Sequence, residues 1–308
     1  MTPTTTTTTK TANTTDPATM TMNTTNPATA DAAARARRRG RAGCKTLTGL
    51  GLTGVMLFPV YWMLNASLTR DQDLRKTPPA LLPLHPTLEG YRAVIHQQLP
   101  YLGTSLTIAL ATVALTLTLA APAGYSLAKL RPKGAGILSF LLLAAQMVPG
   151  IIMAMGFYAL LLGTHLINTL PGLILADTTL AVPFGVLVLT AFMHTIPDEL
   201  LQAARTDGAG PLRTFRSIVL PLSRNALVTV ALFTFLWAWS DFIFASTLDQ
   251  GGTRQPITLG IYHYIGNNNQ QWNAITATAA LASLPATLLL ILAQRYIATG
   301  ITTGAIKD

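Results

Sequence analysis

The sequence predicts an all-α integral membrane protein with six transmembrane helices and a cytoplasmic helix-turn-helix between the fourth and the fifth. Half of the residues are hydrophobic and only 11% are charged, whereas about a quarter of a soluble domain is charged. The apolar residues form runs long enough to cross a hydrocarbon core of about 30 Å as helices. Basic residues flank these runs at alternate turns, as the positive-inside rule requires.

The composition also limits the classes of partner. The formal net charge is +9 and the sequence pI is about 10.0, which can indicate a nucleic-acid-binding protein. The basic residues, however, sit beside apolar runs rather than along one polar face, so we expect a membrane protein with no nucleic-acid partner. The single cysteine, Cys44, excludes an internal disulfide framework.

The first 45 residues are expected to form a disordered cytoplasmic tail, and residues 46–308 to form one six-span domain. Residues 1–34 are rich in Thr, Ala and Asn, and an arginine cluster follows at 35–41. Few large apolar groups are present to offset the entropy of ordering this segment. The arginines resemble an export signal faintly, but the following apolar run is long and lacks a cleavage site, which favours an uncleaved anchor.

Six spans account for the charge-free runs of the remaining chain. Only helices and closed β-barrels satisfy all their backbone hydrogen bonds in lipid, and these runs are too long for barrel strands. The basic turns 129–133 and 205–224 then fall on the same side as the tail, so the chain is predicted to cross its membrane several times with both termini in the cytoplasm. The predicted spans are 46–69, 101–128, 136–162, 172–195, 225–248 and 274–293, and the predicted external segments are 70–99, 163–171 and 249–273.

No constellation in the sequence predicts catalysis or metal binding. The five histidines are scattered, and neither a His-Glu-x-x-His pattern nor a cysteine pair occurs. A Gly-x-x-x-x-Gly-Lys phosphate loop is also absent from the sequence, so any ATP that this chain depends on must be hydrolysed by a partner. We therefore expect a chain that is not an enzyme and that holds no cofactor or metal of its own.

Charged residues are scarce within the predicted spans, and Asp241 is the main exception. It lies in the run Trp237-Ala-Trp-Ser-Asp-Phe near the end of the fifth span. One interpretation places its carboxylate in a water-filled cavity or gate, and the other places it at the outer interface in a structural role. Asp177 is expected near the outer end of the fourth span.

The polar interruption at 196–222 carries the most information. Pro197 and the following Asp-Glu pair suit the first turn of a helix, and Gly208 suits a left-handed helix stop. Pro211 then begins a second helix, whose apolar stripe is expected at Leu212, Phe215, Val219 and Leu222, with Ile218 beside it. Two interpretations remain open on these grounds: a docking element for another protein, or an amphipathic connector on the membrane.

The run Gln202-Ala-Ala-Arg-Thr-Asp-Gly-Ala, followed by Leu220-Pro221, resembles the EAA coupling motif of bacterial ABC importer permeases. The spacing of that motif is kept, although Gln202 stands where the family has Glu. The resemblance implies that the segment couples the permease to an ATPase. The residues that it assigns to this coupling are Gln202, Ala203, Ala204, Asp207, Gly208, Phe215, Leu220 and Pro221.

Further runs are similar to MalG-like subunits of carbohydrate importers, with the MetI-like type of permease domain. They include Gly124-Tyr-Ser-Leu-Ala-Lys, Met147-Val-Pro and Trp239-Ser-Asp-Phe. This resemblance implies a heterodimer with a second permease, two ABC ATPase subunits that bind ATP and Mg²⁺, an external solute-binding protein and a sugar substrate. It also implies that the chain lies in the inner membrane of a bacterium and has a substrate pathway that includes Trp239 and Asp241.

Two other functions stay open at this point. An ion-coupled secondary transporter would need buried charged relays within the spans. A membrane-embedded enzyme or scaffold would need a catalytic cluster, or uptake that survives loss of the chain. The spacing of the coupling motif argues against both.

Overall fold

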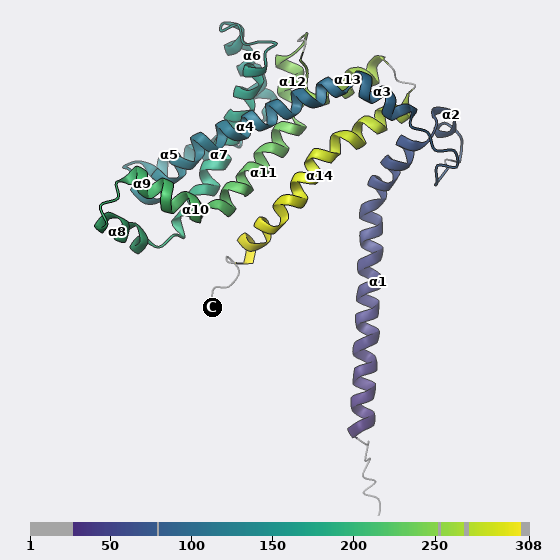
Figure 1. Cartoon of the computed structure of the whole chain (residues 1–308), viewed down its shortest axis with the longest axis horizontal. Helices are drawn as coiled ribbons and strands as arrows, with labels where there is room; N and C mark the ends of the chain where they lie inside the picture. The colour runs from purple at the N-terminus through teal and green to yellow at the C-terminus, as the bar shows by residue number, and fades with distance from the viewer. Residues whose placement is uncertain (1–26, 79, 252–253, 268–270, 303–308) are drawn as a thin grey trace, which may run out of the picture. The chain divides into compact units, whose positions relative to one another are not determined.

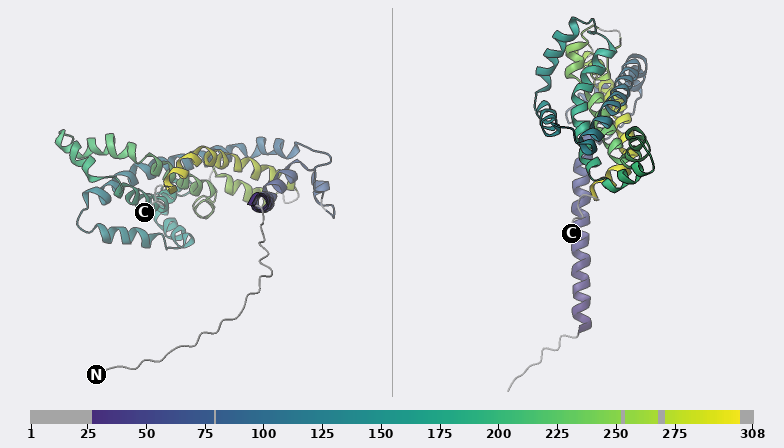
Figure 2. Two further views of the ribbon diagram at one scale, coloured as in Figure 1. Left: turned by 90° about the horizontal axis from the view of Figure 1, so that it is seen from below. Right: turned by 90° about the vertical axis from the view of Figure 1, so that its left-hand side faces the viewer.

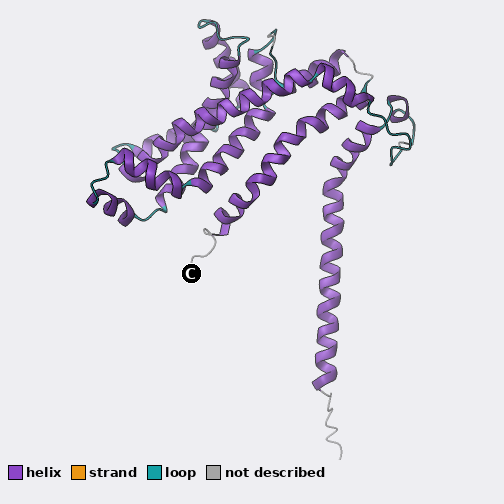
Figure 3. Cartoon of the chain, in the orientation of Figure 1, coloured by secondary structure: helices purple, strands orange, loops and turns teal. Residues whose placement is uncertain are grey.

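The computed structural model describes residues 27–78, 80–251, 254–267 and 271–302, and every regular element within these ranges is a helix (Figure 3). The chain divides between Pro59 and Val60 into two compact units. We describe each unit by itself.

Helix α1 runs from Pro27 to Leu68 and contains the boundary between the two units at Pro59. The expected disordered tail 1–45 is therefore helical from Pro27 onward, and its first 26 residues lie outside the described ranges. Alanine and arginine dominate 32–41 and are strong helix formers, which explains why the helix begins well before the apolar run. The stretch Lys45–Leu68 is long and apolar enough to cross a membrane.

Four helices form the body of the second unit: α4 (Leu99–Tyr125), α7 (Leu170–His194), α11 (Arg224–Ser240) and α14 (Trp272–Thr302). Helix α4 packs against α7 and α11, and α11 also packs against α14 (Figure 1, Figure 2). Gly185 of α7 permits a close approach of α4 and α11. A Cβ atom there would lie 3.0 Å from Ala120 Cβ and 3.1 Å from Val230 Cγ1. Small residues at such crossings are typical of helix packing in membranes.

The third predicted span is broken. Helix α5 (Ala135–Ala145) and helix α6 (Gly150–Leu162) are bent by 99° at the intervening residues, so the prediction of one continuous helix over 136–162 is wrong. Pro149 explains the break, because proline lacks a backbone N–H and disfavours helical geometry in the residue before it.

The fifth predicted span is also shorter than expected. Helix α11 ends at Ser240, and a separate helix α12 (Ile243–Leu248) follows. Asp241 causes the interruption: its backbone is extended, and its carboxylate accepts hydrogen bonds from the N–H groups of Phe244 at 3.2 Å and Ala245 at 2.9 Å. Such capping begins a new helix rather than continuing the old one.

The span count follows from these two breaks. Within the described residues, four helices are individually long and apolar enough to cross a membrane, and the number rises to six if each of two bent pairs is one crossing. The second bent pair joins 211–222 to α11 at an angle of 75°. The all-α membrane architecture is confirmed, whereas the count of six crossings stays a prediction.

The predicted external segments contain helices of their own. Helices α2 (Asp71–Leu74) and α3 (Glu89–Gln97) lie in the first segment, and α13 (Ile257–Asn267) lies in the third. Helix α3 packs on α14, where Gly90 allows close contact: a Cβ there would lie 2.7 Å from the Asn273 carbonyl oxygen. Pro78, Pro83 and Pro86 lie in the non-helical stretch between α2 and α3.

Candidate functional site

The polar interruption folds as two helical segments joined at Gly208. Helix α8 (Asp198–Thr206) follows Pro197, and the second segment comprises α9 (Pro211–Thr214), a π-helical turn η2 (Phe215–Val219) and α10 (Leu220–Leu222). Gly208 has a φ of +78°, and the Ala209 N–H donates to the carbonyl oxygen of Ala204 at 2.9 Å. The left-handed glycine thus ends α8 as the sequence predicted.

The inner face of this helix-turn-helix is part of the hydrophobic core. Ile196, Leu201 and Val219 are buried in one cluster with Leu127 and Ala128, which follow α4. The rings of Phe215 and Tyr125 lie 5.1 Å apart between centroids. Apolar contacts therefore hold the segment against the C-terminal end of α4 and the turn that follows it.

The predicted coupling residues divide into two groups. Gln202, Ala203, Asp207, Gly208 and Pro221 are exposed, whereas Ala204 is buried, and Phe215 and Leu220 pack partly buried against the core. The second group therefore holds the segment in place instead of offering a surface to a partner.

The residues of the predicted apolar stripe on the second helix do not form one buried face. Val219 is fully buried, but Leu212 is 59% exposed and Leu222 is 47% exposed. The π-helical turn η2 lies between them. Because a π turn adds a residue to the helical repeat, spacing counted at 3.6 residues per turn loses register across it.

A buried lysine connects this segment to α4. Lys129 lies in the π-helical turn η1 (Ser126–Leu130) that follows α4, and its side chain is only 2% exposed. Its Nζ donates to Asp198 Oδ1 at 2.6 Å and to the carbonyl oxygen of Ile196. The hydrogen bond from Lys129 lowers the pKa of Asp198, and the charges of Lys129, Arg131 and His194 act in the same direction.

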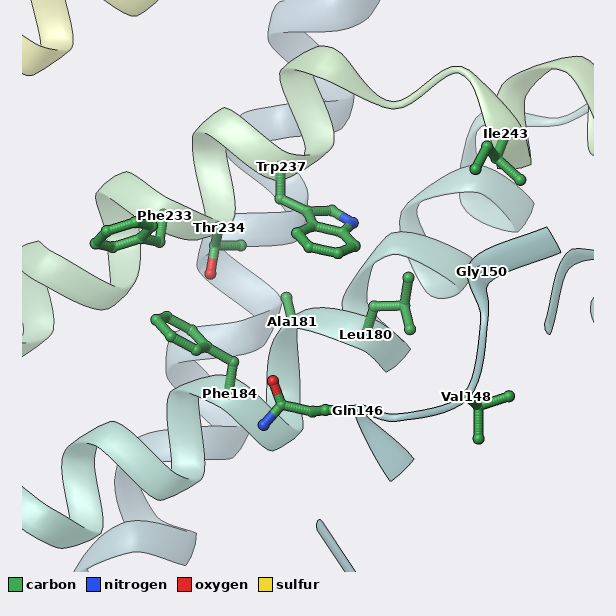
Figure 4. Close-up of a pocket in the computed structure, with 10 residues that line it drawn as sticks. All are labelled: Gln146, Val148, Gly150, Leu180, Ala181, Phe184, Phe233, Thr234, Trp237 and Ile243. Atoms are coloured by element: carbon green, nitrogen blue, oxygen red, sulfur yellow. The ribbon is translucent and has the colours of Figure 1, made fainter. Parts of the chain in front are cut away.

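A cleft of about 330 Å³ lies where the α5–α6 break faces α7 and α11 (Figure 4). Three aromatic rings line it, from Phe184, Phe233 and Trp237, and the Phe184 and Phe233 centroids are 5.6 Å apart. Gln146 and Thr234 add an amide and a hydroxyl. Such a lining, mostly apolar with a few polar groups, is typical of small-molecule sites.

The two residues predicted for the substrate pathway lie differently. Trp239 is 7% exposed, stacks on Phe235 at 5.5 Å and donates from Nε1 to the carbonyl oxygen of Ala282 at 3.0 Å, so it belongs to the α11–α14 packing. Asp241 lines a smaller hollow beside the cleft, together with Trp237 and Ser240.

Sequence reasoning missed Trp237, which lines both the cleft and the neighbouring hollow. The signal was present, because Phe233 and Trp237 are four residues apart and share a helix face. Trp239, two residues farther along, points to a different side of the same helix.

Two findings concern metal and ion sites. Within the described part of the chain, no group of three or more His, Cys, Asp or Glu residues is placed to hold a metal ion. Asp177 of α7 is 2% exposed, and its Oδ1 has no hydrogen-bond partner among the described residues. Asp177 lies in the first third of α7, and its carboxyl group is enclosed by the bundle.

Comparison with known proteins identifies the family. Residues 120–303 match the family described as binding-protein-dependent transport system inner membrane component. This range contains the cleft, the helix-turn-helix and the bent helices. The chain belongs to this family. It is thus an inner-membrane component of a binding-protein-dependent transport system, which confirms the resemblance to ABC importer permeases.

Relatives of known name agree with this assignment. A putative ABC transporter permease protein of Streptomyces antibioticus is 35% identical over 229 residues, which is 74% of this chain and 100% of the relative. The trehalose transport system permease protein SugB of Mycobacterium tuberculosis is 32% identical over 262 residues, which is 83% of this chain and 94% of the relative.

A solved structure shows the same fold. In the crystal structure of a bacterial ABC transporter involved in the import of the acidic polysaccharide alginate, one chain matches 85% of this chain and 98% of its own length. The TM-score is 0.71 at 18% sequence identity. The two chains therefore share the same fold.

Proposed function

We propose that this permease forms one half of the translocation pore of an ATP-driven sugar importer, as a heterodimer with a second permease. Two ABC ATPase subunits would bind ATP and Mg²⁺, and an external solute-binding protein would deliver the sugar. The helix-turn-helix at 196–222 would contact the ATPase, with this segment and both termini in the cytoplasm.

The exposed turn of the helix-turn-helix carries this proposal. Gln202, Ala203, Asp207 and Gly208 are exposed, while Leu201 and Val219 are buried in a core cluster with residues of α4, α7 and α11. A short helical protrusion with small residues on its outer face can seat in a groove of another protein. Because its inner face is fastened to the bundle, a movement of that partner would reach the transmembrane helices.

The cleft between the α5–α6 break, α7 and α11 supports a sugar as the substrate. Aromatic rings such as Trp237 offer flat apolar faces with polar edges, which suit the C–H faces of a sugar ring. The Gln146 amide and the Thr234 hydroxyl supply hydrogen-bonding groups for sugar hydroxyls. The named function of SugB, trehalose transport, makes a disaccharide the first substrate to test.

Transport by the purified complex tests the proposal. The chain is tagged, isolated with its partners from its own bacterial membranes, and reconstituted in proteoliposomes with the solute-binding protein. We expect uptake of radiolabelled trehalose or maltose that requires hydrolysable ATP and stops with a non-hydrolysable analogue. If uptake instead follows an imposed proton or sodium gradient without ATP, the proposal is wrong.

The buried carboxyl group of Asp177 is the observation that favours the alternative, an ion-coupled secondary transporter. Intramembrane carboxyl groups commonly serve as ion relays. Under the ATP-driven proposal, ionophores that collapse both gradients leave the uptake unchanged. Under the alternative, the same ionophores abolish it, and so does Asp177→Asn.

A further inference from the structure

Lys129 joins the end of α4 to the beginning of the helix-turn-helix. Its ammonium group lies 2.6 Å from Asp198 Oδ1 and also donates to the carbonyl oxygen of Ile196, while its side chain is 2% exposed. We propose that Lys129 is a positioning residue that makes α4 follow the helix-turn-helix when an ATPase moves it. This inference rests on the proposed ATP-driven function.

The two π-helical turns meet at this junction. Turn η1 follows α4 and is capped by the next residue, Arg131, whose φ is +47° and whose N–H donates to the carbonyl oxygen of Ser126 at 3.0 Å. Turn η2 begins at Phe215, whose ring lies against Tyr125, the last residue of α4. Such turns frequently mark functional sites in helices; here one contains Lys129, and the other packs through Phe215 on the end of α4.

Apolar contacts alone would not fix the position of the helix-turn-helix against α4. The Phe215–Tyr125 pair and the cluster around Leu127 and Val219 resist separation, but hydrophobic contact is non-directional and permits sliding. Hydrogen bonds from an ionised donor are directional and stronger than neutral ones. The bonds of Lys129 to Ile196, which lies between α7 and α8, and to Asp198, the first residue of α8, therefore set the register between α4 and the helix-turn-helix.

Burial distinguishes Lys129 from the second basic residue at this site. Arg131 lies 3.6 Å from Asp198 Oδ2, but its side chain is 65% exposed. An exposed ion pair is screened by water and contributes little, whereas an enclosed ammonium group that loses its partners is strongly destabilised. The structure thus offers a matched comparison: two cations pair with one carboxylate, and only one of them is buried.

The test measures coupling in the complete complex. Lys129→Met keeps the apolar stem and removes both hydrogen bonds. We expect ATP hydrolysis to persist and the sugar taken up per ATP hydrolysed to fall at least about fivefold, the lower end of typical coupling effects. Arg131→Gln should keep this ratio within about twofold of wild type. An unchanged ratio in Lys129→Met overturns the inference.

A second variant keeps the inference testable if Lys129→Met fails to assemble. Asp198→Asn alters a side chain that is 51% exposed, and it leaves an acceptor oxygen and the bond to Ile196 in place. We expect an intermediate coupling ratio. If this ratio equals that of wild type, Lys129 has only a structural role and the inference is wrong.

Failure of the inference differs from failure of the proposed function. A wild-type complex without ATP-driven uptake contradicts the proposed function itself. Wild-type uptake with unchanged ratios in both variants contradicts only the role of Lys129.

Discussion

The indole Nε1 of Trp239 donates a hydrogen bond to the carbonyl oxygen of Ala282 at 3.0 Å and so connects α11 to α14. Trp237, two residues earlier on α11, is 54% exposed and lines the cleft instead. The two tryptophans therefore have separable roles, one in helix packing and one in the cleft.

We expect Trp237→Ala to weaken sugar transport and Trp239→Phe to weaken the fold. Trp239→Phe loses a hydrogen bond with a net value of about 0.5–1.5 kcal/mol, so the thermal unfolding midpoint should fall while the half-saturating sugar concentration stays near that of wild type. Trp237→Ala should raise the half-saturating concentration with little change in the midpoint. A reversed pattern would assign the sugar site to Trp239.

Substitution of Gly208 tests the left-handed turn. Its φ is +78°, and no atom of the chain lies within 4 Å of an added Cβ. A bulky side chain is therefore disfavoured by the backbone, at about 1–2 kcal/mol, and would also protrude toward the ATPase. We expect Gly208→Val to abolish ATP-driven uptake while the protein remains inserted in the membrane.

Two matched variants separate the backbone strain at Gly208 from the steric effect of the side chain on the ATPase. Gly210→Val adds the same side chain two residues away, where φ is −68° and an added Cβ also meets no atom, so it should retain uptake. Gly208→Asn tolerates the left-handed conformation and isolates the steric effect on the partner. Equal uptake by wild type and Gly208→Val would contradict the coupling assignment.

Gly185 tests the close packing of α7 against α4 and α11. An added Cβ would lie 3.0 Å from Ala120 and 3.1 Å from Val230, so the neighbouring helices must move apart. We expect Gly185→Leu to destabilise the protein by at least about 1–3 kcal/mol, as overpacked cores do. The measurement is the thermal unfolding midpoint in detergent.

The control for this variant is Gly156→Leu on α6, where no atom lies within 4 Å of an added Cβ. Its midpoint should remain close to that of wild type. If both variants unfold at the wild-type temperature, the helices do not approach as closely as the structure indicates.

The ion pair between Lys129 and Asp198 makes the stability of the fold depend on pH in a specific way. The hydrogen bond from Lys129 lowers the pKa of Asp198, with smaller contributions in the same direction from the charges of Lys129, Arg131 and His194. A carboxyl group whose pKa is lowered by folding stabilises the fold above its unfolded pKa, about 3.9, and this stabilisation is lost as the pH falls through the folded pKa.

We therefore expect the stability difference between wild type and Asp198→Asn to be constant from pH 7 to about pH 5 and to vanish in more acidic solution. Thermal unfolding of the complex at a series of pH values measures it. As a control, Glu199→Gln removes the adjacent carboxylate and should still show the loss of stability in acid that Asp198 causes. A difference that grows with acidity would contradict the sign of the pKa shift.

Sequence patterns located the interruption and its turn because both depend on local chemistry. Pro197 and the acidic pair after it begin α8, and Gly208 ends it with a positive φ. These are properties of single residues and their neighbours, so they can be read without knowledge of the fold. The same reasoning missed the breaks at Pro149 and Asp241, because apolar composition is continuous across them while backbone geometry is not.

Composition, charge distribution and motif spacing by themselves determined that this chain is a helical membrane protein with a polar helix-turn-helix of the permease type. Tertiary structure alone decided that Ala204 and Phe215 face inward, that Trp237 rather than Trp239 lines the cleft, and that Lys129 bonds to Asp198. The reason is physical. Helical periodicity shows which residues share a face, but the face that meets a neighbour depends on contacts between residues distant in sequence, here 69 positions apart for Lys129 and Asp198.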